Sequence, residues 1–272
     1  MVTADPRRQY ARLKPVAEYA AAGMADLGIS SGEVLLAADP RQMVQYLRDG
    51  RVDWVTETVF GAFRLQEEAG AILLLRRWKD GVAEYRSLFI TRRSGDIEHL
   101  GDLPGRTVAF EDRGSTTAYF APAAALREAG HDLVELESAG LRAPEGKVGF
   151  VFARSEVNIA VWAARGIVAA GALDSVSWDD PGQALRAARA DLRVFQESTP
   201  LPRAVELVRN ELDPAVRDRL RSVLLAAHLD GNATAALAAY SQTRRFDEFA
   251  GVAADRLAEA RRTFDRHRTL FN

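Results

Sequence analysis

The sequence predicts an α/β protein built from two lobes. Of its 272 residues, 47% are hydrophobic and 27% are charged, which is the composition of an ordinary globular protein. A chain of this length is expected to form one large domain or two lobes of roughly 100–150 residues. Short apolar stretches alternate with stretches of helical periodicity along most of the chain. This alternation is typical of α/β units whose sheet is largely parallel.

The first ninety residues contain alternating helices and strands. Apolar residues recur at helical spacing from Tyr10 to Leu27, so residues about 8–28 are predicted to form an amphipathic helix. Further helices are expected after Asp39-Pro40, ending at Gly50, and over residues about 58–69. Strands are predicted at Val34–Leu36, Val52–Val55 and Ile72–Leu75.

The rest of the chain repeats this pattern and then becomes helical. Strands are predicted at Tyr85–Thr91, Thr107–Phe110, Val148–Phe152, Val168–Ala172 and Arg193–Phe195. Helices are predicted at Thr116–Ala129, at Glu156–Arg165 and from about Asp213 onward. Each side of residue 90 is therefore expected to form an α/β unit of its own, with the C-terminal helices left over.

Charge and residue usage exclude several classes of function. The formal net charge is -2, so no basic face is predicted and no nucleic-acid partner is expected. The chain has no cysteine, which excludes disulfides, thiolate metal sites and thiol nucleophiles. The four histidines are scattered without the spacing of metal ligands, and no phosphate-binding or dinucleotide-binding glycine motif is present. Neither a metal nor a cofactor is expected.

The sequence contains no membrane-spanning segment by composition. No apolar run approaches the roughly 20 residues of a transmembrane helix, so no membrane insertion is expected. The N-terminus also lacks the basic and then apolar pattern of a signal peptide. Composition leaves two alternatives open, a cytoplasmic protein or an exported one whose signal has been removed from this sequence.

The turn Gly114-Ser115-Thr116-Thr117 is the clearest candidate for ligand binding. It follows a predicted strand and places hydroxyl groups at the start of a predicted helix. The first N–H groups of a helix have no internal partners, and the helix dipole concentrates partial positive charge there. Ser115, Thr116 and Thr117 can therefore hold a tetrahedral anion without a full positive charge. The alternative is that one hydroxyl only caps the helix.

Four further polar residues are candidates for the same ligand. The phenol of Tyr85, at the start of its predicted strand, can donate to an anion oxygen or can simply pack. Glu57 and Thr58 follow the strand Val52–Val55, where open α/β sheets usually bind ligands. A carboxylate at Glu57 or at Glu156 repels a bare anion and favours a ligand that presents a proton or an ammonium group. The alternative for both glutamates is a solvated surface position.

Several stretches resemble one known family, the phosphate/phosphite/phosphonate-binding proteins of ABC importers. The most telling are Gly114–Thr117 and the Tyr119-Phe120-Ala121-Pro122 that follows. The resemblance covers the chain to at least Pro202. Its other matching segments are Leu13–Tyr19, Gln42-Met43, Gly50–Trp54, Glu84–Ser87, Asp102–Arg106 and Ala109–Asp112.

The resemblance implies a two-lobed periplasmic-binding-protein-like fold with the ligand between the lobes. Two crossover strands, near residues 88–92 and 196–201, would join lobe 1 (1–90 plus 200–272) to lobe 2 (91–199). It also implies a periplasmic or lipid-anchored extracytoplasmic protein that closes on a small phosphate-like oxyanion and delivers it to an ABC permease. A sensory role, with the closed form recognised by a receptor or kinase, uses the same fold. An enzyme is disfavoured, because only Glu57 and Glu156 could serve as an acid–base pair.

The sequence departs from the family pattern at four places. The family usually begins with a strand before the first helix, and only a few residues precede Asp5-Pro6 here. Thr117 replaces a frequent serine in the anion-binding turn. Glu156 matches a histidine that many members carry, and Ala169 matches an aspartate. The last two departures leave phosphate, phosphite and phosphonates all open as ligands.

Overall fold

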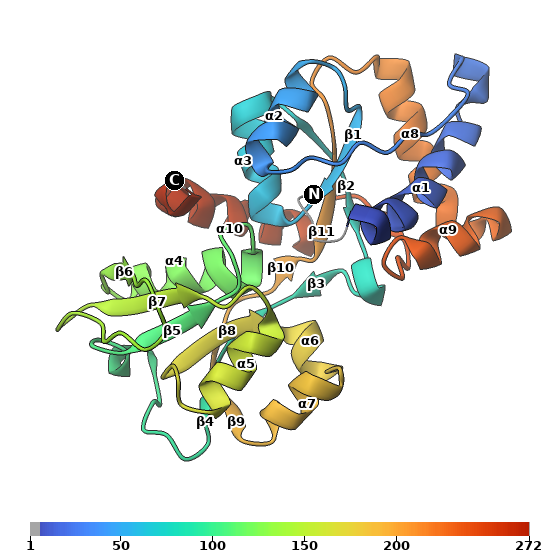
Figure 1. Cartoon of the computed structure of the whole chain (residues 1–272). Coiled ribbons are helices and arrows are strands. Elements are labelled where there is room, and N and C mark those ends of the chain that lie inside the picture. The colour runs from blue at the N-terminus through green and yellow to red at the C-terminus, as the bar shows by residue number, and fades with distance from the viewer. Residues whose placement is uncertain (1–5, 272) are drawn as a thin grey trace. The chain divides into compact units, whose positions relative to one another are not determined.

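A computed structural model describes residues 6–271, which divide into two compact units (Figure 1). Unit 1 is the chain up to Glu84 together with Pro202–Arg261, and unit 2 is Tyr85–Leu201 together with the chain from Arg262. The chain crosses from one unit to the other three times. The first two crossings lie within two short strands that pair with each other, β3 (Glu84–Tyr85) and β10 (Leu201–Pro202). The third lies inside the last helix, α10 (Val252–His267).

The sheet of unit 1 differs from the expected largely parallel arrangement. Its order is β1 (Trp54–Glu57), β11 (Ala204–Val208), β2 (Ile72–Arg77) and β12 (Phe246–Asp247), and every pair is antiparallel. β1 and β2 run in the same direction, but β11 lies between them. Because β11 is formed by the chain returning from unit 2, it enters the sheet in the opposite direction. The prediction of a parallel sheet was therefore wrong for this unit.

The predicted helices of unit 1 are confirmed. α1 (Pro6–Ala22) packs beside α8 (Pro214–Ala226) and α9 (Thr234–Ala239), and α2 (Pro40–Arg48) packs against α3 (Val59–Ala69). α2 begins where the sequence indicated, because the side chain of Asp39 accepts a hydrogen bond from the Gln42 amide and Pro40 occupies the first turn.

The predicted strand Val34–Leu36 is wrong, since the segment forms no strand. Exposed and half-buried residues do alternate from Ser31 to Leu36, which is the pattern that suggested a strand. A strand also needs a partner, and residues 31–36 make no backbone–backbone hydrogen bond to any described residue. Residues 31–36 contact α1 instead. Gly32 lies against that helix, and its carbonyl accepts a hydrogen bond from Lys14 Nζ at 2.9 Å.

The sheet of unit 2 has the expected parallel core. Its order is β6 (Leu133–Glu135), β7 (Val148–Phe152), β5 (Thr107–Phe110), β8 (Ala170–Asp174), β4 (Ser87–Arg92) and β9 (Leu192–Glu197). The four strands from β6 to β8 are parallel, and β4 is antiparallel to both of its neighbours. The bounds of β5 and β7 match the prediction. β6 and the helices α6 (Ser175–Asp179) and α7 (Gln183–Arg189) were not predicted.

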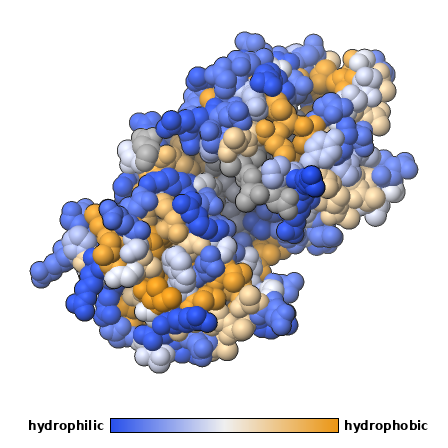
Figure 2. Space-filling model, in the orientation of Figure 1, coloured by the Kyte–Doolittle hydropathy of each residue, from blue (hydrophilic) through white to orange (hydrophobic). Residues whose placement is uncertain are grey.

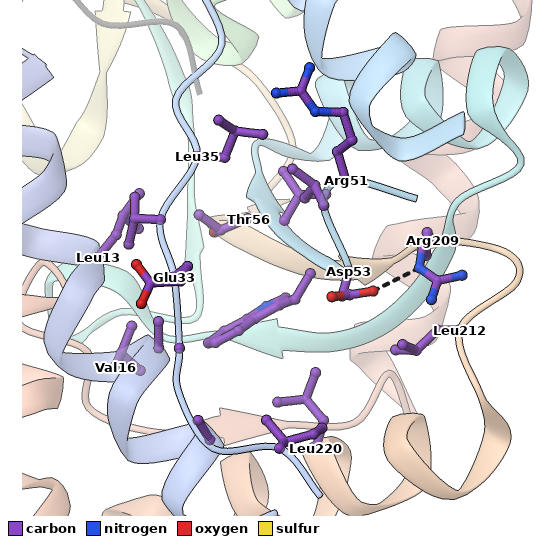
Figure 3. Close-up of a pocket in the computed structure, with 18 of the residues that line it drawn as sticks. Leu13, Val16, Glu33, Leu35, Arg51, Asp53, Thr56, Arg209, Leu212 and Leu220 are labelled. Carbon is purple, nitrogen blue, oxygen red and sulfur yellow. Dashed lines mark hydrogen bonds and ion pairs between the residues drawn. The ribbon is translucent and has the colours of Figure 1, made fainter. Parts of the chain in front are cut away.

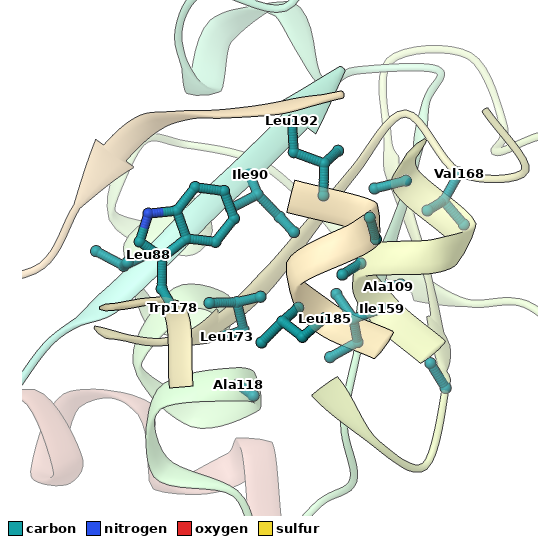
Figure 4. Packing of buried hydrophobic residues seen from close by; sticks show 14 of the residues in the cluster. Leu88, Ile90, Ala109, Ala118, Ile159, Val168, Leu173, Trp178, Leu185 and Leu192 are labelled. Atoms are coloured by element: carbon teal, nitrogen blue, oxygen red, sulfur yellow. The ribbon is translucent and has the colours of Figure 1, made fainter. Parts of the chain in front are cut away.

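One apolar cluster organises unit 2 (Figure 4). Leu88 and Ile90 from β4, Ala109 from β5 and Leu173 from β8 meet side chains of α5 (Glu156–Ala164) and α7. Burying such side chains stabilises each by about 1.5–3 kcal/mol relative to exposure. The cluster fixes the parallel strands and so fixes where their carboxyl ends lie.

The visible surface is mostly hydrophilic, with apolar residues in separate patches (Figure 2). Among the described residues, the most exposed large apolar side chains are Leu229 and Val252, in unit 1. Within residues 6–271, no helix combines the length and the apolar character needed to cross a membrane.

Candidate functional site

The carboxyl ends of the parallel strands form the candidate site of unit 2. β5, β7 and β8 run in one direction, so their ends at Phe110, Phe152 and Asp174 lie at one edge of the sheet. A helix begins after each of these strands, at Thr116, Glu156 and Ser175. This edge therefore gathers three helix starts, and open α/β sheets usually bind ligands at such an edge.

Ser115 caps the helix that follows β5. Its Oγ accepts a hydrogen bond from the Ala118 amide at 3.1 Å, so Ser115 caps the helix. The preceding turn is closed by Asp112, whose Oδ1 accepts from the Gly114 amide at 2.7 Å. The hydroxyl hydrogen of Ser115 can still donate, because a capping oxygen uses only a lone pair.

Thr116 carries a buried hydroxyl that lacks a partner. The residue is 1% exposed, and its Oγ1 makes no hydrogen bond within the described part of the chain. Leaving a buried hydroxyl unsatisfied costs about 1–3 kcal/mol, so native proteins rarely do so without a reason. Thr117 is also buried, and its carbonyl accepts from Ser87 Oγ at 2.5 Å.

The helix opens with a π turn over Thr116–Phe120, a feature that the sequence did not predict. The Phe120 amide donates to the Ser115 carbonyl at 3.0 Å, and the Glu111 amide donates to the Ala118 carbonyl at 2.9 Å. The turn continues directly into α4 (Ala121–Glu128). π turns are rare and occur frequently at functional sites.

The C-terminal end of the chain anchors this helix. Phe120 stacks on Phe264 and Phe271, with ring centroids 5.9 Å and 4.7 Å away. Tyr119 donates its hydroxyl to the Leu270 carbonyl at 3.0 Å. Residues more than a hundred positions away in sequence thereby hold the helix start that carries Thr116.

Glu156 and Asp174 form a carboxyl pair at the same edge. Glu156 Oε1 accepts from the Asp174 amide at 2.6 Å, and Asp174 Oδ1 accepts from the Ser177 amide at 2.7 Å. Burial, the nearby charge of Asp174 and, more weakly, that of Glu111 raise the pKa of Glu156 to about 8. Near neutral pH this carboxyl therefore holds a proton that it can donate. The sequence analysis missed Asp174, whose only local signal is its place at a strand end.

The remaining predicted residues occupy two other places. Tyr85 is 4% exposed on β3, where the chain enters unit 2. Glu57 and Thr58 lie in unit 1, where Glu57 Oε2 accepts from the Thr58 amide at 2.9 Å at the start of α3. Thr58 Oγ1 is a buried atom without a hydrogen-bond partner in the described chain. The structure thus groups the hydroxyl turn with Glu156 in one unit and pairs Glu57 with Thr58 in the other.

Unit 1 also contains a buried polar cluster that the sequence did not reveal. Glu206, at the centre of β11, is fully buried and accepts from Trp54 Nε1 at 2.6 Å and from the Tyr240 hydroxyl at 3.1 Å. Arg77 Nε lies 3.2 Å from Glu206 Oε1. Burial raises the pKa of Glu206, and the charge of Arg77 opposes that shift. Two hydrogen bonds and the nearby charge of Arg77 hold the Glu206 carboxyl in place, which gives the cluster a structural role.

A cavity of about 600 Å³ lies in unit 1 between residues 31–36 and the free edge of β1 (Figure 3). Its walls are mostly apolar and include Leu13, Val16 and Leu220. The charged pair at its wall, Asp53 with Arg209, is joined at 2.7 Å. The cavity separates Val34–Leu36 from β1, which explains why that predicted strand does not form. Glu33 and Arg51 also line the cavity.

Two α/β units joined by paired crossing strands define the class of two-lobed periplasmic binding proteins. The chain belongs to the family described as ABC transporter, phosphonate, periplasmic substrate-binding protein, whose model matches residues 1–255. Members of this family are transport binding proteins located outside the cytoplasm, which work with a membrane permease and a small ligand. Within residues 6–271, no group of three or more histidine, aspartate or glutamate side chains could hold a metal ion.

Solved structures share this fold. XAC2383 from Xanthomonas citri bound to ATP is 36% identical, with a TM-score of 0.91, over 97% of this chain and 96% of that one. PhnD1 from Prochlorococcus marinus in complex with methylphosphonate is 16% identical, with a TM-score of 0.68, over 96% and 94% of the two chains. A phosphonate-transporter binding protein from Pseudomonas aeruginosa is 18% identical, with a TM-score of 0.68, over 98% and 85%. The last two show likeness of fold alone.

Proposed function

We propose that this protein is the solute-binding component of an ABC importer and that it binds a phosphate-like oxyanion. Ser115, Thr116 and Thr117 form the anion-binding element of unit 2, and Glu57 with Thr58 form the element of unit 1. Tyr85 supplies a phenol donor. The anion is enclosed when the two units close on it, as the family resemblance implies.

The unpartnered hydroxyl of Thr116 carries this proposal. A helix start offers N–H donors and partial positive charge, but many helix starts bind nothing. Here a hydroxyl that is 1% exposed and lacks a partner lies at the start of a helical run from Thr116 to Glu128. A bound oxyanion would accept a hydrogen bond from this hydroxyl and remove the cost of leaving it unsatisfied.

Glu156 supports an anionic ligand over a cationic one. With its pKa at about 8, the carboxyl is mostly protonated near pH 7 and can donate a hydrogen bond to an anion oxygen. The family position that it matches is often a histidine, which can donate in the same way. Phosphate, phosphite and alkylphosphonates all fit this set of donors.

A phosphate group on a larger molecule is the second candidate. XAC2383, at 36% identity over nearly the whole chain, is bound to ATP. A nucleotide would offer its phosphates to the same hydroxyl turn. We therefore include ATP beside the small oxyanions in the experiment below.

We assign transport and not catalysis or sensing. Family membership supports delivery to a permease. We expect the protein to work in the periplasm or attached by lipid outside the cytoplasm, without inserting into the bilayer and without nucleic acid.

The test is calorimetric titration of protein that has been freed of ligand by unfolding and refolding. The panel contains phosphate, phosphite, methylphosphonate, 2-aminoethylphosphonate, ATP and sulfate. Thr116→Val removes the hydroxyl and keeps the shape of the side chain. Thr91→Val is the matched control, because its hydroxyl is also buried in unit 2 but bonds the Ala169 carbonyl at 2.8 Å, near the opposite ends of the parallel strands.

We expect tight binding of one phosphorus compound by the wild type and by Thr91→Val. Thr116→Val should lose about 1–3 kcal/mol of binding free energy, since a hydrogen bond to a charged group is lost. Binding that is unchanged by Thr116→Val, or absent across the whole panel, would contradict the proposed function.

A further inference from the structure

A second cavity lies in unit 2, at the edge of the sheet opposite to the hydroxyl turn. The parallel strands β5 and β8 begin there at Thr107 and Ala170, and β4, which is antiparallel to β8, ends beside them at Arg92. The loops at this edge enclose a cavity of about 500 Å³. This volume lies within the range of about 300–1,000 Å³ that is typical of small-molecule sites.

Three arginines line this cavity, and two of them carry uncompensated charge. Arg106 pairs at 2.7 Å with Asp96, which lines the cavity as well. Within residues 6–271, neither Arg92 nor Arg142 makes an ion pair or a side-chain hydrogen bond. A guanidinium is always charged, and its N–H donors match a carboxylate or a phosphate group. The cavity therefore favours an anionic group.

Gly166 provides the surface against which the Arg92 guanidinium lies. A Cβ atom at position 166 would lie 2.9 Å from Arg92 Cζ and 3.0 Å from its Nη1. Cβ atoms essentially never come so close to other atoms, so a larger residue at position 166 would displace the guanidinium. Gly166 also has a φ of 68°, which glycine adopts more readily than other residues. The charge of Arg92 thus lies at the cavity wall, directly beside the backbone.

Apolar side chains in the wall of the same cavity indicate the rest of the ligand. Leu141 is 48% exposed and Ile167 is 45% exposed, and both line the cavity. Among the described residues, eight large apolar side chains are exposed, so this one cavity holds two of them. Covering them removes apolar surface from water, which stabilises a complex. A ligand that combines an acidic group with an apolar body fits both features of the cavity.

We propose that this cavity is a second binding site, which takes an organic anion with an acidic group on an apolar body, such as a medium-chain carboxylate. Arg92 and Arg142 bind the acidic group, and Leu141 and Ile167 cover the apolar body. The site lies at the opposite edge of the sheet from Ser115–Thr117. It is therefore separate from the oxyanion site and does not rest on the proposed function.

The alternative is that Arg92 only stabilises the carboxyl end of α5. That helix ends at Ala164, two residues before Gly166, and a cation is favoured at this end of the helix dipole. In that case Arg92 would contribute to stability and not to binding, so the two roles can be separated by measuring both quantities.

Calorimetric titration with octanoate tests the proposal. Acetate has the same acidic group without the apolar body, and octanol has the same body without the charge. The variants are Arg92→Met, Arg142→Met and Gly166→Ala, the last of which displaces the Arg92 guanidinium. Arg186→Met is the control, because Arg186 is an exposed residue of unit 2 that does not line the cavity. Thermal unfolding checks that each variant is folded and measures its stability.

We expect the wild type and Arg186→Met to bind octanoate more tightly than they bind acetate or octanol. Arg92→Met and Arg142→Met should each weaken octanoate binding about tenfold, since each removes a hydrogen bond to a charged group. Gly166→Ala should act in the same direction. The proposal is overturned if octanoate does not bind, or if Arg92→Met lowers stability and leaves octanoate binding unchanged.

Thr116→Val separates this site from the one proposed for the oxyanion. It should bind octanoate as the wild type does, while its phosphate binding falls. Loss of octanoate binding in Thr116→Val would assign octanoate to the oxyanion site and overturn the second site. Octanoate binding that depends on Arg92, in a protein that binds no phosphorus compound, would support the second site and contradict the proposed function.

Discussion

Arg77 and Glu206 form an ion pair in the core of unit 1, with Arg77 Nε 3.2 Å from Glu206 Oε1 and side chains that are 2% and 0% exposed. The two residues belong to adjacent strands, β2 and β11. The Arg77 Cζ atom lies 3.9 Å from the centroid of the Tyr240 ring, and the Tyr240 hydroxyl donates a hydrogen bond to Glu206. The strand that returns from unit 2 is therefore joined to the sheet by charge as well as by backbone pairing.

Arg77→Met should lower the free energy of unfolding by about 3–5 kcal/mol at neutral pH, because it leaves the Glu206 carboxylate buried without its partner. Burial raises the pKa of Glu206, and loss of the arginine should raise it further. The variant can then relieve the buried charge by taking up a proton. The deficit should therefore shrink as the pH falls, which urea unfolding at neutral and acidic pH would reveal.

Arg64→Met is the control for this prediction. Its pair with Glu68 is partly exposed, and such pairs contribute about 0–1 kcal/mol. Equal destabilisation by both variants would mean that the Arg77–Glu206 pair has no special role.

Phe120→Ala should weaken anion binding as well as stability. Removing a large buried aromatic side chain costs about 3–5 kcal/mol, and here it also removes the stacking on Phe264 and Phe271 that holds the helix start of Thr116. Phe246→Ala, in the core of unit 1, should cost a similar amount and leave anion affinity unchanged in the folded protein. Thermal unfolding and calorimetric titration of both variants would separate the two effects.

The proton on Glu156 predicts a pH dependence of stability. Its pKa is raised from an ordinary value of 4.5 to about 8 by burial and by Asp174. Between these pH values the folded state binds more protons than the unfolded state, so the free energy of unfolding falls as the pH rises. Glu156→Gln keeps an acceptor for the Asp174 amide and has no proton to lose.

Glu156→Gln should therefore match the wild type near pH 4.5 and exceed its stability above pH 8, by roughly 2 kcal/mol after allowance for partial exposure. Thermal unfolding measured across this range checks the prediction. Glu145→Gln, at an exposed turn position, should follow the wild-type curve. A variant that is less stable than the wild type at high pH would show that Glu156 is a stabilising carboxylate.

Local sequence signals predicted the parallel half of unit 2 well. Thr107–Phe110 and Val148–Phe152 are short apolar runs bounded by turn residues, and they form strands with those bounds. Ala204–Val208 was missed, because Glu206 interrupts its apolar pattern and its pairing partners lie far away in the chain. At Val34–Leu36 the sequence predicted a strand that does not form. The segment has a strand-like pattern, but it lines a cavity and has no partner strand beside it.

The candidate site shows the same limit of local reasoning. Ser115–Thr117 could be predicted because the rule for a helix start depends on neighbouring residues alone. Asp174 could not, because its role depends on contacts with side chains that only the fold reveals. Glu156 was recognised as a candidate, but the proton on it follows from burial beside Asp174.

Thr116→Val should make the unliganded protein as stable as the wild type or more stable, by up to about 1 kcal/mol, while it weakens anion binding. Valine has the shape of threonine and fills the same buried space. It also removes a hydroxyl that lacks a hydrogen-bond partner in the described chain. Replacing an unsatisfied buried polar group by an apolar one is nearly neutral or stabilising, and residues that a protein keeps at such a cost are commonly functional.

Two alternative roles of the Thr116 hydroxyl predict different results for this variant. If the Thr116 hydroxyl had a structural partner, Thr116→Val would destabilise the unliganded protein by about 1 kcal/mol, as Thr91→Val should when it loses its bond to Ala169. If the hydroxyl had no role, stability would rise and affinity would not change. Only a ligand-binding hydroxyl combines retained stability with lost affinity, and chemical unfolding of ligand-free protein beside phosphate titration measures both quantities.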